Sequence, residues 1–538
     1  MVPEIKGIPD IIRQGIASGW NTTDGSTLER DLTIETDVVI IGTGAGGGTA
    51  AEILSRQGLK VTMIEEGPLK SSDDFSMQDH QAFTELYQDG LTRASLDGGF
   101  TIAQGRCVGG STTINWTSSF RTPEDTLNFW AREFNVKGVS PEEMAPWFEK
   151  MEQRLNITYW DMPPNANNHV LEKGSQALGI DWQIIPRNVK GCWNLGYCGH
   201  GCPTNAKQSM LVTTIPTALN NDGELLFRTR AQKLLMNGDK VTGVECIALS
   251  ANDVNPTGIR VTVNAKHTIV ACGAIGGPGL LLRSGVPDPH KRIGKRTFLH
   301  PVPFSVAEFA EPINGFYGAP QSIYSDHFQW KDGVSGPIGF KLEVAPLQPG
   351  FMAAVIMGHG DLHRWQMEQL PYLNSMIALL RDGFHEDSQG GTIELRHDGS
   401  PAVDYPLNDY VMDGIVRALR VMAQIQFAAG AKRVRPVHSR SRFSDTLEDA
   451  LKQIDSLTME TNSVRVGCAH VMGGCGMGED PKTSVTNSNG EFHFLENLSV
   501  MDGSLFPTSI GANPQLSIYG LVAKLATNLG EKLNVATS

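Results

Sequence analysis

The sequence predicts an α/β fold, α+β overall, in which a domain built on a parallel β-sheet is interrupted by a second domain of sheet plus helices. A β-branched run at 37–41, a helical stretch at 49–56 and a second apolar run at 61–64 form a βαβ unit. Uninterrupted apolar runs of this kind are typical of strands buried on both faces of a parallel sheet. The stretch 298–456 differs, since it mixes short strands with turns and contains no such unit.

The turn inside the βαβ unit is a glycine loop, Gly42-Thr43-Gly44-Ala45-Gly46-Gly47. The pattern G-x-G-x-x-G directly after a strand and before a helix is typical of Rossmann-like dinucleotide-binding domains, because glycine lets the backbone approach a pyrophosphate at the helix N-terminus. Glu65 ends the second strand, where a carboxylate can accept hydrogen bonds from ribose hydroxyls. The alternative is a purely structural glycine turn, and the motif alone does not choose between NAD and FAD.

The chain of 538 residues is long enough for at least two domains. We expect an irregular N-terminal extension at 1–36, a first part of the nucleotide-binding domain at 37–297, an inserted substrate-binding domain at 298–456 and the rest of the nucleotide-binding domain at 457–538. Further strands are expected at 260–264, 267–271 and 498–501, and further helices at 141–153, 409–429 and 516–533.

Composition argues against two classes of partner. The formal net charge of -13 and the pI near 5.6 disfavour nucleic acid, because phosphate binding needs a basic surface. No apolar run approaches the roughly 18 residues that a membrane helix needs. The stretch from Met1 to Glu35 has no basic region followed by an apolar one, so we expect a cytoplasmic location, with periplasmic export on a partner subunit left open.

A second loop dense in small residues lies at 105–115, Gly-Arg-Cys-Val-Gly-Gly-Ser-Thr-Thr-Ile-Asn. It resembles the first signature of the glucose-methanol-choline (GMC) oxidoreductases, and 273–286 resembles their second signature. Two shorter stretches, 229–231 and 500–504, also resemble strands of that family. The likeness runs from about Asp37 to the last helix and implies a Rossmann-like FAD-binding domain with a sheet-based substrate domain.

The resemblance implies FAD as the cofactor. In that family the first signature passes the pyrophosphate and the isoalloxazine, the strand at Ala231 contacts adenine, and the stretch 500–504 lies near the ribityl chain. Ile114 stands where some relatives have a His joined to the flavin, so we expect non-covalent FAD. The residues expected to bind FAD are Gly42, Thr43, Gly44, Ala45, Gly46, Gly47, Glu65, Gly105, Arg106, Gly109, Gly110, Ser111, Asn115, Ala231, Asp502, Gly503, Pro514 and Gln515.

Two residues are expected to be catalytic. Oxidation of an alcohol by a flavin needs a base for the hydroxyl proton, and histidine has a suitable pKa. His470 begins a segment that resembles the family pattern H-x-x-G-x-x-x-M-G with its catalytic His, and Asn513 matches the second family position before the last helix. An amide there can donate to the substrate oxygen. A hydrogen-bonded structural histidine is the alternative for His470, and it is the favoured interpretation of His300, which also resembles a family position.

Three cysteines cluster in the spacing Cys192-x5-Cys198-x3-Cys202 before Pro203. The run is similar to a bacterial ferredoxin motif that lacks its second cysteine, and three thiolates suit a 3Fe-4S cluster. The spacing also resembles the catalytic subunit of bacterial FAD-dependent glucose dehydrogenase, a GMC member that passes electrons through such a cluster to a cytochrome. A solvent-shielded structural loop is the other interpretation.

The function expected from these observations is FAD-dependent oxidation of an alcohol to an aldehyde or ketone by hydride transfer to flavin N5. An apolar stretch at 350–357 with Trp365 resembles the substrate domain of long-chain alcohol oxidases and favours a hydrophobic primary alcohol, although these residues would serve equally as core. The alternatives are a sugar dehydrogenase subunit with a small or cytochrome partner, and a non-catalytic flavin-binding protein. Oxygen, a quinone or a cytochrome would accept the electrons.

Overall fold

The N-terminal region is ordered rather than irregular. The computed structural model describes residues 7–537, so residues 1–6 of the expected extension lie outside it. Helix α1 (Ile11–Ala17) begins where the Asp10 carboxylate accepts a hydrogen bond from the Arg13 N–H at 2.9 Å, and strand β1 (Asn21–Asp24) pairs with the main sheet. The prediction of an irregular stretch was therefore wrong for residues 7–36, because capping and edge pairing act on residues that have no apolar period.

The main sheet has the strand order β1-β8-β3-β2-β11-β10-β9, with β22 also paired to β11. Its pairs are parallel except around β10, which is antiparallel to both of its neighbours. The runs expected at 260–264 and 267–271 are one continuous strand. The bounds are β1 Asn21–Asp24, β2 Leu32–Ile41, β3 Val61–Ile64, β8 Glu224–Phe227, β9 Thr229–Asn237, β10 Lys240–Leu249, β11 Pro256–Val270 and β22 Leu498–Val500.

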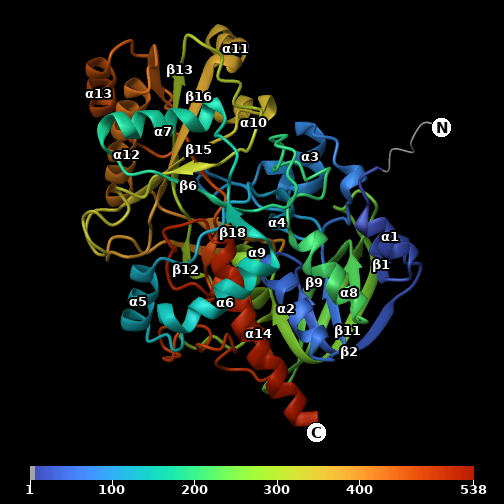
Figure 1. The fold of residues 1–538 in the computed structure, drawn as a ribbon. Helices are drawn as coiled ribbons and strands as arrows, with labels where there is room; N and C mark the ends of the chain where they lie inside the picture. The colour runs from blue at the N-terminus through green and yellow to red at the C-terminus, as the bar shows by residue number, and fades with distance from the viewer. Residues whose placement is uncertain (1–6, 538) are drawn as a thin grey trace, which may run out of the picture.

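Helices cover the main sheet and confirm the expected βαβ unit. Helix α2 (Ala45–Arg56) follows β2 and packs against α8 (Thr214–Asn220) and the long α14 (Gln515–Thr537), which runs beside it in Figure 1. Helix α9 (Gly273–Ser284) follows β11 and packs on β9. Val38 to Ile40 are wholly buried between these layers, as expected for a central parallel strand.

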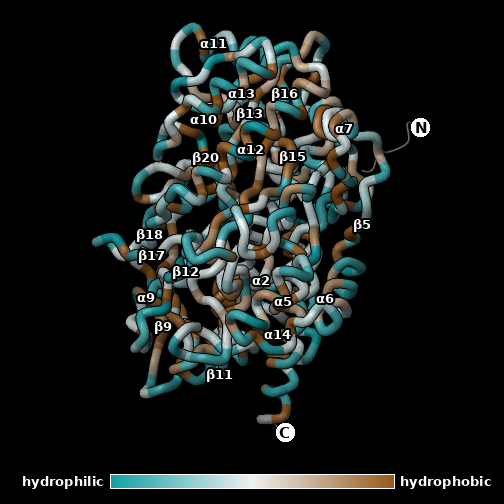
Figure 2. The backbone as a smooth tube through the Cα atoms, turned by 90° about the vertical axis from the view of Figure 1, so that its left-hand side faces the viewer, coloured by the Kyte–Doolittle hydropathy of each residue, from teal (hydrophilic) through white to brown (hydrophobic). Residues whose placement is uncertain are grey.

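A second sheet has the order β15-β16-β13-β20-β4, with β19 also paired to β13. In both Figure 1 and Figure 2, β13, β15 and β16 lie above β11 of the main sheet. Two of its strands, β4 and β20, come from outside 298–456, so the expected domain boundaries stay a prediction. The bounds are β4 Phe100–Ile102, β13 Val302–Glu308, β15 Phe340–Val344, β16 Leu373–Leu380, β19 Arg433–Pro436 and β20 Val466–Cys468.

The remaining elements pack around the main sheet and the second sheet. Helix α12 packs on β13, β16 and β19 of the second sheet and also contacts α7 and α13. A four-stranded sheet, β18-β17-β12-β21, lies beside α9, and two short pairs join β5 to β7 and β6 to β14. The helices are α3 Asp79–Leu86, α4 Ser111–Ile114, α5 Glu124–Glu133, α6 Pro141–Arg154, α7 Ala166–Leu178, α10 Pro349–Val355, α11 Gly360–Glu368, α12 Asp409–Ala428 and α13 Leu447–Ser456. The strands are β5 Ile157–Tyr159, β6 Gln183–Ile184, β7 Pro186–Asn188, β12 Lys295–Phe298, β14 Ile323–Tyr324, β17 Gly391–Leu395, β18 Pro401–Asp404 and β21 Met472–Gly473.

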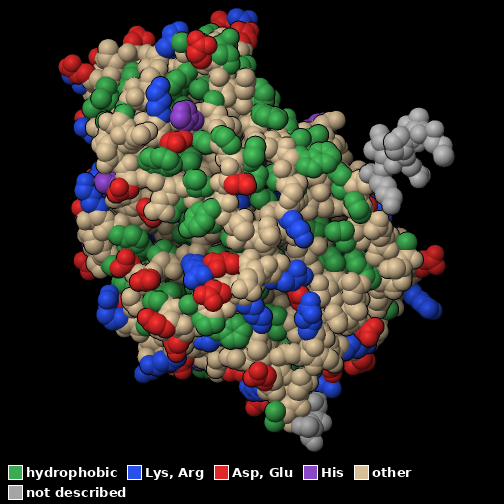
Figure 3. All heavy atoms as spheres, viewed as in Figure 1, with side chains coloured by type: hydrophobic (Ala, Val, Ile, Leu, Met, Phe, Trp, Pro, Cys, Tyr) green, Lys and Arg blue, Asp and Glu red, His purple; other side chains and the backbone are tan. Residues whose placement is uncertain are grey.

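The surface agrees with the acidic composition. Acidic and basic side chains are interspersed over the face drawn in Figure 3, without a continuous basic area on that face. Over the described part of the chain, every helix is too short or too polar to cross a membrane.

Candidate active site

A cavity of about 950 Å³ lies between the main and the second sheet. Its lower wall is formed where β2, β3, β11 and β22 end, at the carboxyl edge of the parallel strands, which is the usual place for a ligand in such sheets. The volume is at the upper end of the roughly 300–1,000 Å³ common for small-molecule sites. The expected site residues that line it are Gly42, Thr43, Gly44, Ala45, Gly46, Glu65, Gly105, Arg106, Gly110, Ser111, Asn115, Ala231, His470, Asp502, Gly503, Asn513, Pro514 and Gln515.

The first glycine loop brings the N-terminus of α2 to this cavity. Gly44 is the N-cap residue and provides no side-chain cap, so the first backbone N–H groups of α2 are free to bind an anion. A Cβ on Gly46 would lie 1.8 Å from the Met501 carbonyl oxygen, and one on Gly47 would lie 1.9 Å from the Gly42 carbonyl oxygen. Gly47 thus packs α2 against the sheet and does not line the cavity.

The two glycine-rich loops contact each other, which the sequence did not indicate. The Gly109 N–H donates to Thr43 Oγ1 at 3.0 Å. Gly109 therefore supports the first loop from behind the cavity wall and does not itself line the cavity. Gly110 adopts a φ of +53°, and a Cβ there would lie 2.8 Å from the Gly44 Cα. Only glycine allows this close approach of the two backbones.

Glu65 is held by protein donors. Its carboxylate accepts hydrogen bonds from the Thr43 hydroxyl at 2.7 Å, from the Thr43 N–H at 3.2 Å and from the Gly67 N–H at 3.0 Å. Burial raises the pKa of Glu65. Glu65 therefore supports the first loop, and any ribose contact would use its remaining lone pairs.

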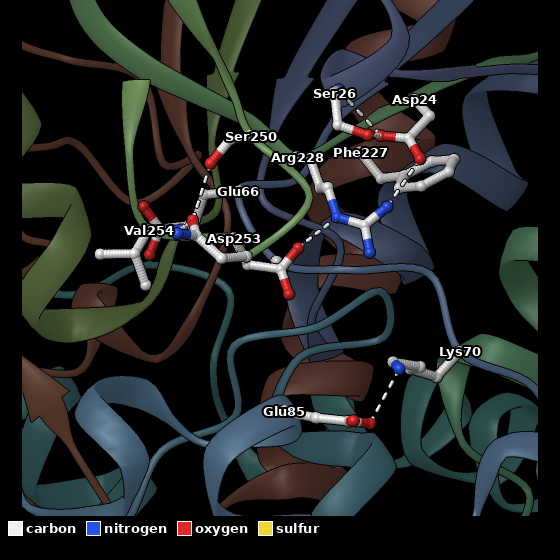
Figure 4. A network of polar contacts seen from close by, with 12 residues as sticks. Asp24, Ser26, Glu66, Lys70, Glu85, Phe227, Arg228, Ser250, Asp253 and Val254 are labelled. Carbon is white, nitrogen blue, oxygen red and sulfur yellow. Dashed lines mark hydrogen bonds and ion pairs between the residues drawn. The ribbon is translucent and has the colours of Figure 1, made fainter. Parts of the chain in front are cut away.

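The neighbouring Glu66 lies on the cavity wall and was missed by sequence reasoning. It accepts hydrogen bonds from Arg106 at 3.0 Å and from Arg230 at 3.1 Å. Nearby, Arg228 bridges Asp24, at 2.6 Å, and Asp253, a network shown in Figure 4. Two adjacent glutamates after β3 were the available signal, but the partners of Glu66 come from a loop and a strand that are distant in sequence.

His470 follows β20 and meets His300, which follows β12. The Nδ1 atoms of the two rings lie 3.0 Å apart, and the rings are perpendicular with centroids 5.2 Å apart. The Gly511 N–H donates to His300 Nε2 at 3.3 Å. Burial, and then the positive charge of Lys341, lower the pKa of His470 to about 3, and burial lowers the pKa of His300 well below 6.5. Both rings are therefore neutral at neutral pH.

Asn513 lies in the loop before α14, on the same cavity as His470. Its Nδ2 donates to Glu343 Oε2 at 3.2 Å, while its Oδ1 is buried without a hydrogen-bond partner. Gln515, the first residue of α14, accepts from Asn115 Nδ2 at 2.8 Å and donates to the Ser118 carbonyl at 2.8 Å. The loop at 105–115 and the start of α14 are thus joined by side-chain hydrogen bonds.

The last two expected cofactor positions are held by backbone and side-chain contacts. Asp502 follows β22, and its carboxylate accepts from the Gly273 N–H at 2.7 Å and from the Ser504 N–H at 2.8 Å. The Ala231 carbonyl accepts from Arg283 at 3.1 Å. Both residues line the cavity, Ala231 on β9 and Asp502 just after β22 of the main sheet.

Two stretches of the chain, residues 83–302 and 387–521, match the N-terminal and C-terminal profiles of the GMC oxidoreductases. The chain belongs to this family. It is 28% identical over 94% of its length to the long-chain-alcohol oxidase FAO1 of Arabidopsis thaliana, of which it covers 68%. It is 29% identical over 93% of its length to an uncharacterized GMC-type oxidoreductase, y4nJ, of Sinorhizobium fredii, of which it covers 96%.

Solved structures show the same fold. Pyridoxine 4-oxidase from Mesorbium loti superposes with a TM-score of 0.69 at 16% identity, over 92% of this chain and 99% of that one. A formate oxidase variant from Aspergillus oryzae superposes with a TM-score of 0.70 at 14% identity, over 93% of this chain and 99% of that one. These structures show the fold, and membership in the GMC family makes the chain an FAD oxidoreductase.

The residues on the main-sheet side fit FAD. Gly44 and Gly110 leave their backbones bare at the N-terminus of α2, as a pyrophosphate requires. No side chain stands there to fill the cradle, because the nearest atom to a Cβ on Gly44 would be the Gly110 Cα at 3.9 Å.

The three cysteines do not fit an iron-sulfur cluster and do not line the cavity. Among residues 7–537, no group of three or more His, Cys, Asp or Glu side chains is placed to hold a metal ion. Instead, the sulfurs accept contacts from their surroundings: Cys192 from the Asn194 N–H at 3.4 Å, Cys198 from Arg187 at 3.8 Å and Cys202 from the Lys207 N–H at 3.5 Å. The expectation of a 3Fe-4S cluster therefore finds no support, because sequence spacing does not by itself set the geometry that a cluster needs.

Proposed function

We propose that this GMC oxidoreductase oxidises the CH–OH group of an alcohol to an aldehyde or ketone, with His470 as the base and Asn513 as the partner that holds the substrate oxygen. One observation carries the proposal: both side chains, from loops far apart in sequence, lie on the same cavity as the two glycine loops. When bound, FAD supplies the acceptor of the hydride at its N5 atom. The long-chain-alcohol oxidases among the relatives support the same chemistry.

The residues that would hold FAD non-covalently are those of the two glycine loops, together with Glu65, Ala231, Asp502 and the start of α14. Free N–H groups of α2 would bind the pyrophosphate. Ile114 has no nucleophilic atom with which to form a covalent bond to the flavin. Pro514 and Gln515 place the positive end of the 23-residue α14 at the cavity, which favours a reduced, anionic ring there.

His470 is neutral before the reaction, as a base must be. Its Nδ1 shares one proton with His300 Nδ1. The Gly511 N–H favours the tautomer in which His300 donates, whereas base action at His470 Nε2 requires the tautomer in which His470 donates. Base action therefore requires His300 to give up the Gly511 hydrogen bond, which at 3.3 Å is the longer of the two contacts. His300 would then hold the ring of His470 in its reactive tautomer.

The substrate we propose is a hydrophobic primary alcohol. On the second-sheet side of the cavity, apolar side chains such as Phe304, Ile377 and Leu379 on β13 and β16 line the wall together with a few polar ones, Gln321, Glu343 and Gln348. A sugar would need a polar partner for each of several hydroxyls, so this lining disfavours the sugar dehydrogenase. Oxygen is the electron acceptor that the oxidases among the relatives suggest.

The test is anaerobic reduction of the FAD-loaded protein by octanol, benzyl alcohol and glucose, followed by admission of air. We expect the flavin absorption to be lost with the first two alcohols and to return with air. His470→Ala should lower the rate constant of flavin reduction by about 10²- to 10⁴-fold, the usual contribution of a general base, while FAD stays bound.

His438→Gln is the matched control, because His438 is also buried but does not line the cavity and bonds to the Thr458 carbonyl at 3.1 Å. It should reduce at the parent rate. Reduction of the flavin by glucose but not by octanol or benzyl alcohol would overturn the proposal of a hydrophobic alcohol. An unchanged rate of flavin reduction in His470→Ala would overturn the assignment of the base.

A further inference from the structure

Glu343 is a buried carboxylate on the cavity wall that the reaction proposed above does not use. It lies on β15 and is 0% exposed. Alternation along the strand puts Lys341 and Glu343 on one face, while Leu342, on the other face, belongs to the core packed against α12 and α7. A buried acid of this kind is costly unless its oxygens are paired. Oε1 of Glu343 is buried without a hydrogen-bond partner, so the partners of Oε2 indicate what the carboxylate does.

Both amide donors that reach Glu343 use the same oxygen. Asn513 Nδ2 lies 3.2 Å from Glu343 Oε2, and Gln321 Nε2 lies 2.6 Å from it. An ionised carboxylate only accepts hydrogen bonds, so it selects the amide orientation in which Nδ2 of Asn513 faces it. In the flipped orientation, Oδ1 would face the carboxylate oxygen and be repelled. The second hydrogen of Nδ2 remains available to the substrate oxygen.

Glu343 is itself held from the other side of the cavity. Gln321 Oε1 accepts from Ser118 Oγ at 2.7 Å, and the Ser118 carbonyl accepts from Gln515 Nε2 at 2.8 Å. The chain of hydrogen bonds therefore runs from Asn513 through the second sheet and back to the first residue of α14. Asn513 and Gln515, two residues apart in sequence, are joined through Glu343 as well as through the backbone.

A positive charge lies beside this carboxylate. Lys341 Nζ lies 3.0 Å from the ring centroid of Phe120 and 4.0 Å from that of Tyr324. Burial raises the pKa of Glu343, and the Lys341 ammonium opposes that rise. Because both amide N–H groups donate to Oε2, this oxygen is an acceptor whether or not Oε1 carries a proton, and it orients the Asn513 amide in either form.

We infer that Glu343 is a positioning residue for Asn513: its carboxylate holds the amide so that an N–H, and not the carbonyl oxygen, faces the substrate oxygen. This inference rests on the proposed function for its kinetic consequence, but the orientation of Asn513 can be observed without any reaction. Nothing in the glycine loops or in the His470 segment supplies this contact. It comes from a strand of the substrate-side sheet.

The test is a double-mutant cycle of Glu343→Leu and Asn513→Ala in FAD-loaded protein. Leucine removes the acceptor, and we expect the rate constant of flavin reduction at saturating alcohol to fall on the order of 10- to 100-fold, the cost of a misplaced catalytic group. Glu343→Gln keeps an acceptor oxygen and should recover most of the loss. In the Asn513→Ala background, Glu343→Leu should change the rate by no more than about twofold, because a residue acting through Asn513 has nothing left to position.

Two further readouts separate positioning from stability. A crystal structure of Glu343→Leu should show the Asn513 amide rotated, and the Kd of a tertiary alcohol, which binds but has no hydride to give, should rise by a smaller factor than the rate constant falls. Glu308→Leu is the matched control: Glu308 is a buried acid on β13 of the same sheet, paired with Arg433 and not on the cavity. It should lower the melting temperature without changing the rate per bound flavin.

Additive effects of Glu343→Leu and Asn513→Ala, or an unrotated Asn513 in the variant, would overturn the inference. The failure of the proposed function is a different outcome. In that case the parent protein does not reduce its flavin with any alcohol, while the crystal structure still reports whether Glu343 sets the orientation of Asn513.

Discussion

On the main-sheet side of the cavity, the wall is made of backbone: Gly42, Gly44 and Gly110 expose peptide groups, and neighbouring residues in sequence stay neighbours in space. On the second-sheet side, the wall is made of single side chains from different strands, such as Phe304, Glu343 and Ile377. A backbone cradle depends on local conformation, whereas a side-chain wall depends on tertiary packing. The first side can therefore be recognised from a motif, while the second can vary and so define the substrate.

The largest expected effect contrasts Gly46→Ala with Gly44→Ala. On Gly46 a Cβ collides with the Met501 carbonyl, so the variant should lose both thermal stability and FAD. On Gly44 a Cβ makes only an ordinary contact with the Gly110 Cα at 3.9 Å, so the variant should keep the melting temperature of the FAD-free protein and lose FAD affinity. Thermal melts and FAD titrations check both. The same change in melting temperature and FAD affinity in both variants would contradict the division in which Gly46 is needed for packing and Gly44 for binding the ligand.

A smaller effect is expected at His300, which joins the two sides. His300→Phe removes the partner of His470 Nδ1 and should lower the rate constant of flavin reduction by about 10- to 100-fold with FAD retained. His300→Asn can place an amide atom near the position of Nδ1 and should restore part of the rate. The measurement is stopped-flow reduction per bound flavin. A full-rate Phe variant would return His300 to a purely structural role.

Acid sensitivity is a smaller effect again. The pKa of His470 is lowered from 6.5 to about 3, so the unfolded chain binds more protons there as pH falls through this window. The stability that this neutral ring contributes is complete above pH 6.5 and is lost progressively toward pH 3. His470→Gln should therefore lose less melting temperature than the parent between pH 6.5 and 4. His267, whose pKa burial lowers to about 4, should act in the same way, so His267→Gln is the parallel test on the main-sheet side.

The smallest effect concerns the cysteine loop. Changing Cys192, Cys198 and Cys202 together to serine should leave FAD content and flavin reduction close to those of the parent, since none of the three thiols lines the cavity. Protein purified without oxygen should contain less than about one iron per chain, as expected for thiols that are not gathered around a metal. Stoichiometric iron in the parent protein, together with slower electron transfer in the triple variant, would support the 3Fe-4S cluster after all.

The sequence predicted the parts of the site that follow local rules. The glycine loop between β2 and α2 needs only a strand, a helix and bare backbone between them, and the α6, α12 and α14 bounds follow from apolar period and caps. It did not predict β1, which forms by pairing with β8, or α1, which packs on α8. It also missed Glu66 and Glu343, because their partners Arg230 and Asn513 are distant in the chain.

By itself, the amino-acid sequence determined the family, the cofactor class and the loops of bare backbone that receive a dinucleotide, since these depend on contiguous residues. Only the tertiary structure decided that His470 faces His300, that Asn513 donates to Glu343 and that Cys192, Cys198 and Cys202 form no metal-binding group in the described chain. The physical reason is the range of the interactions. Backbone conformation is set by adjacent residues, whereas the pairing of buried polar groups is set by the packing of strands and loops that meet only after the chain has folded.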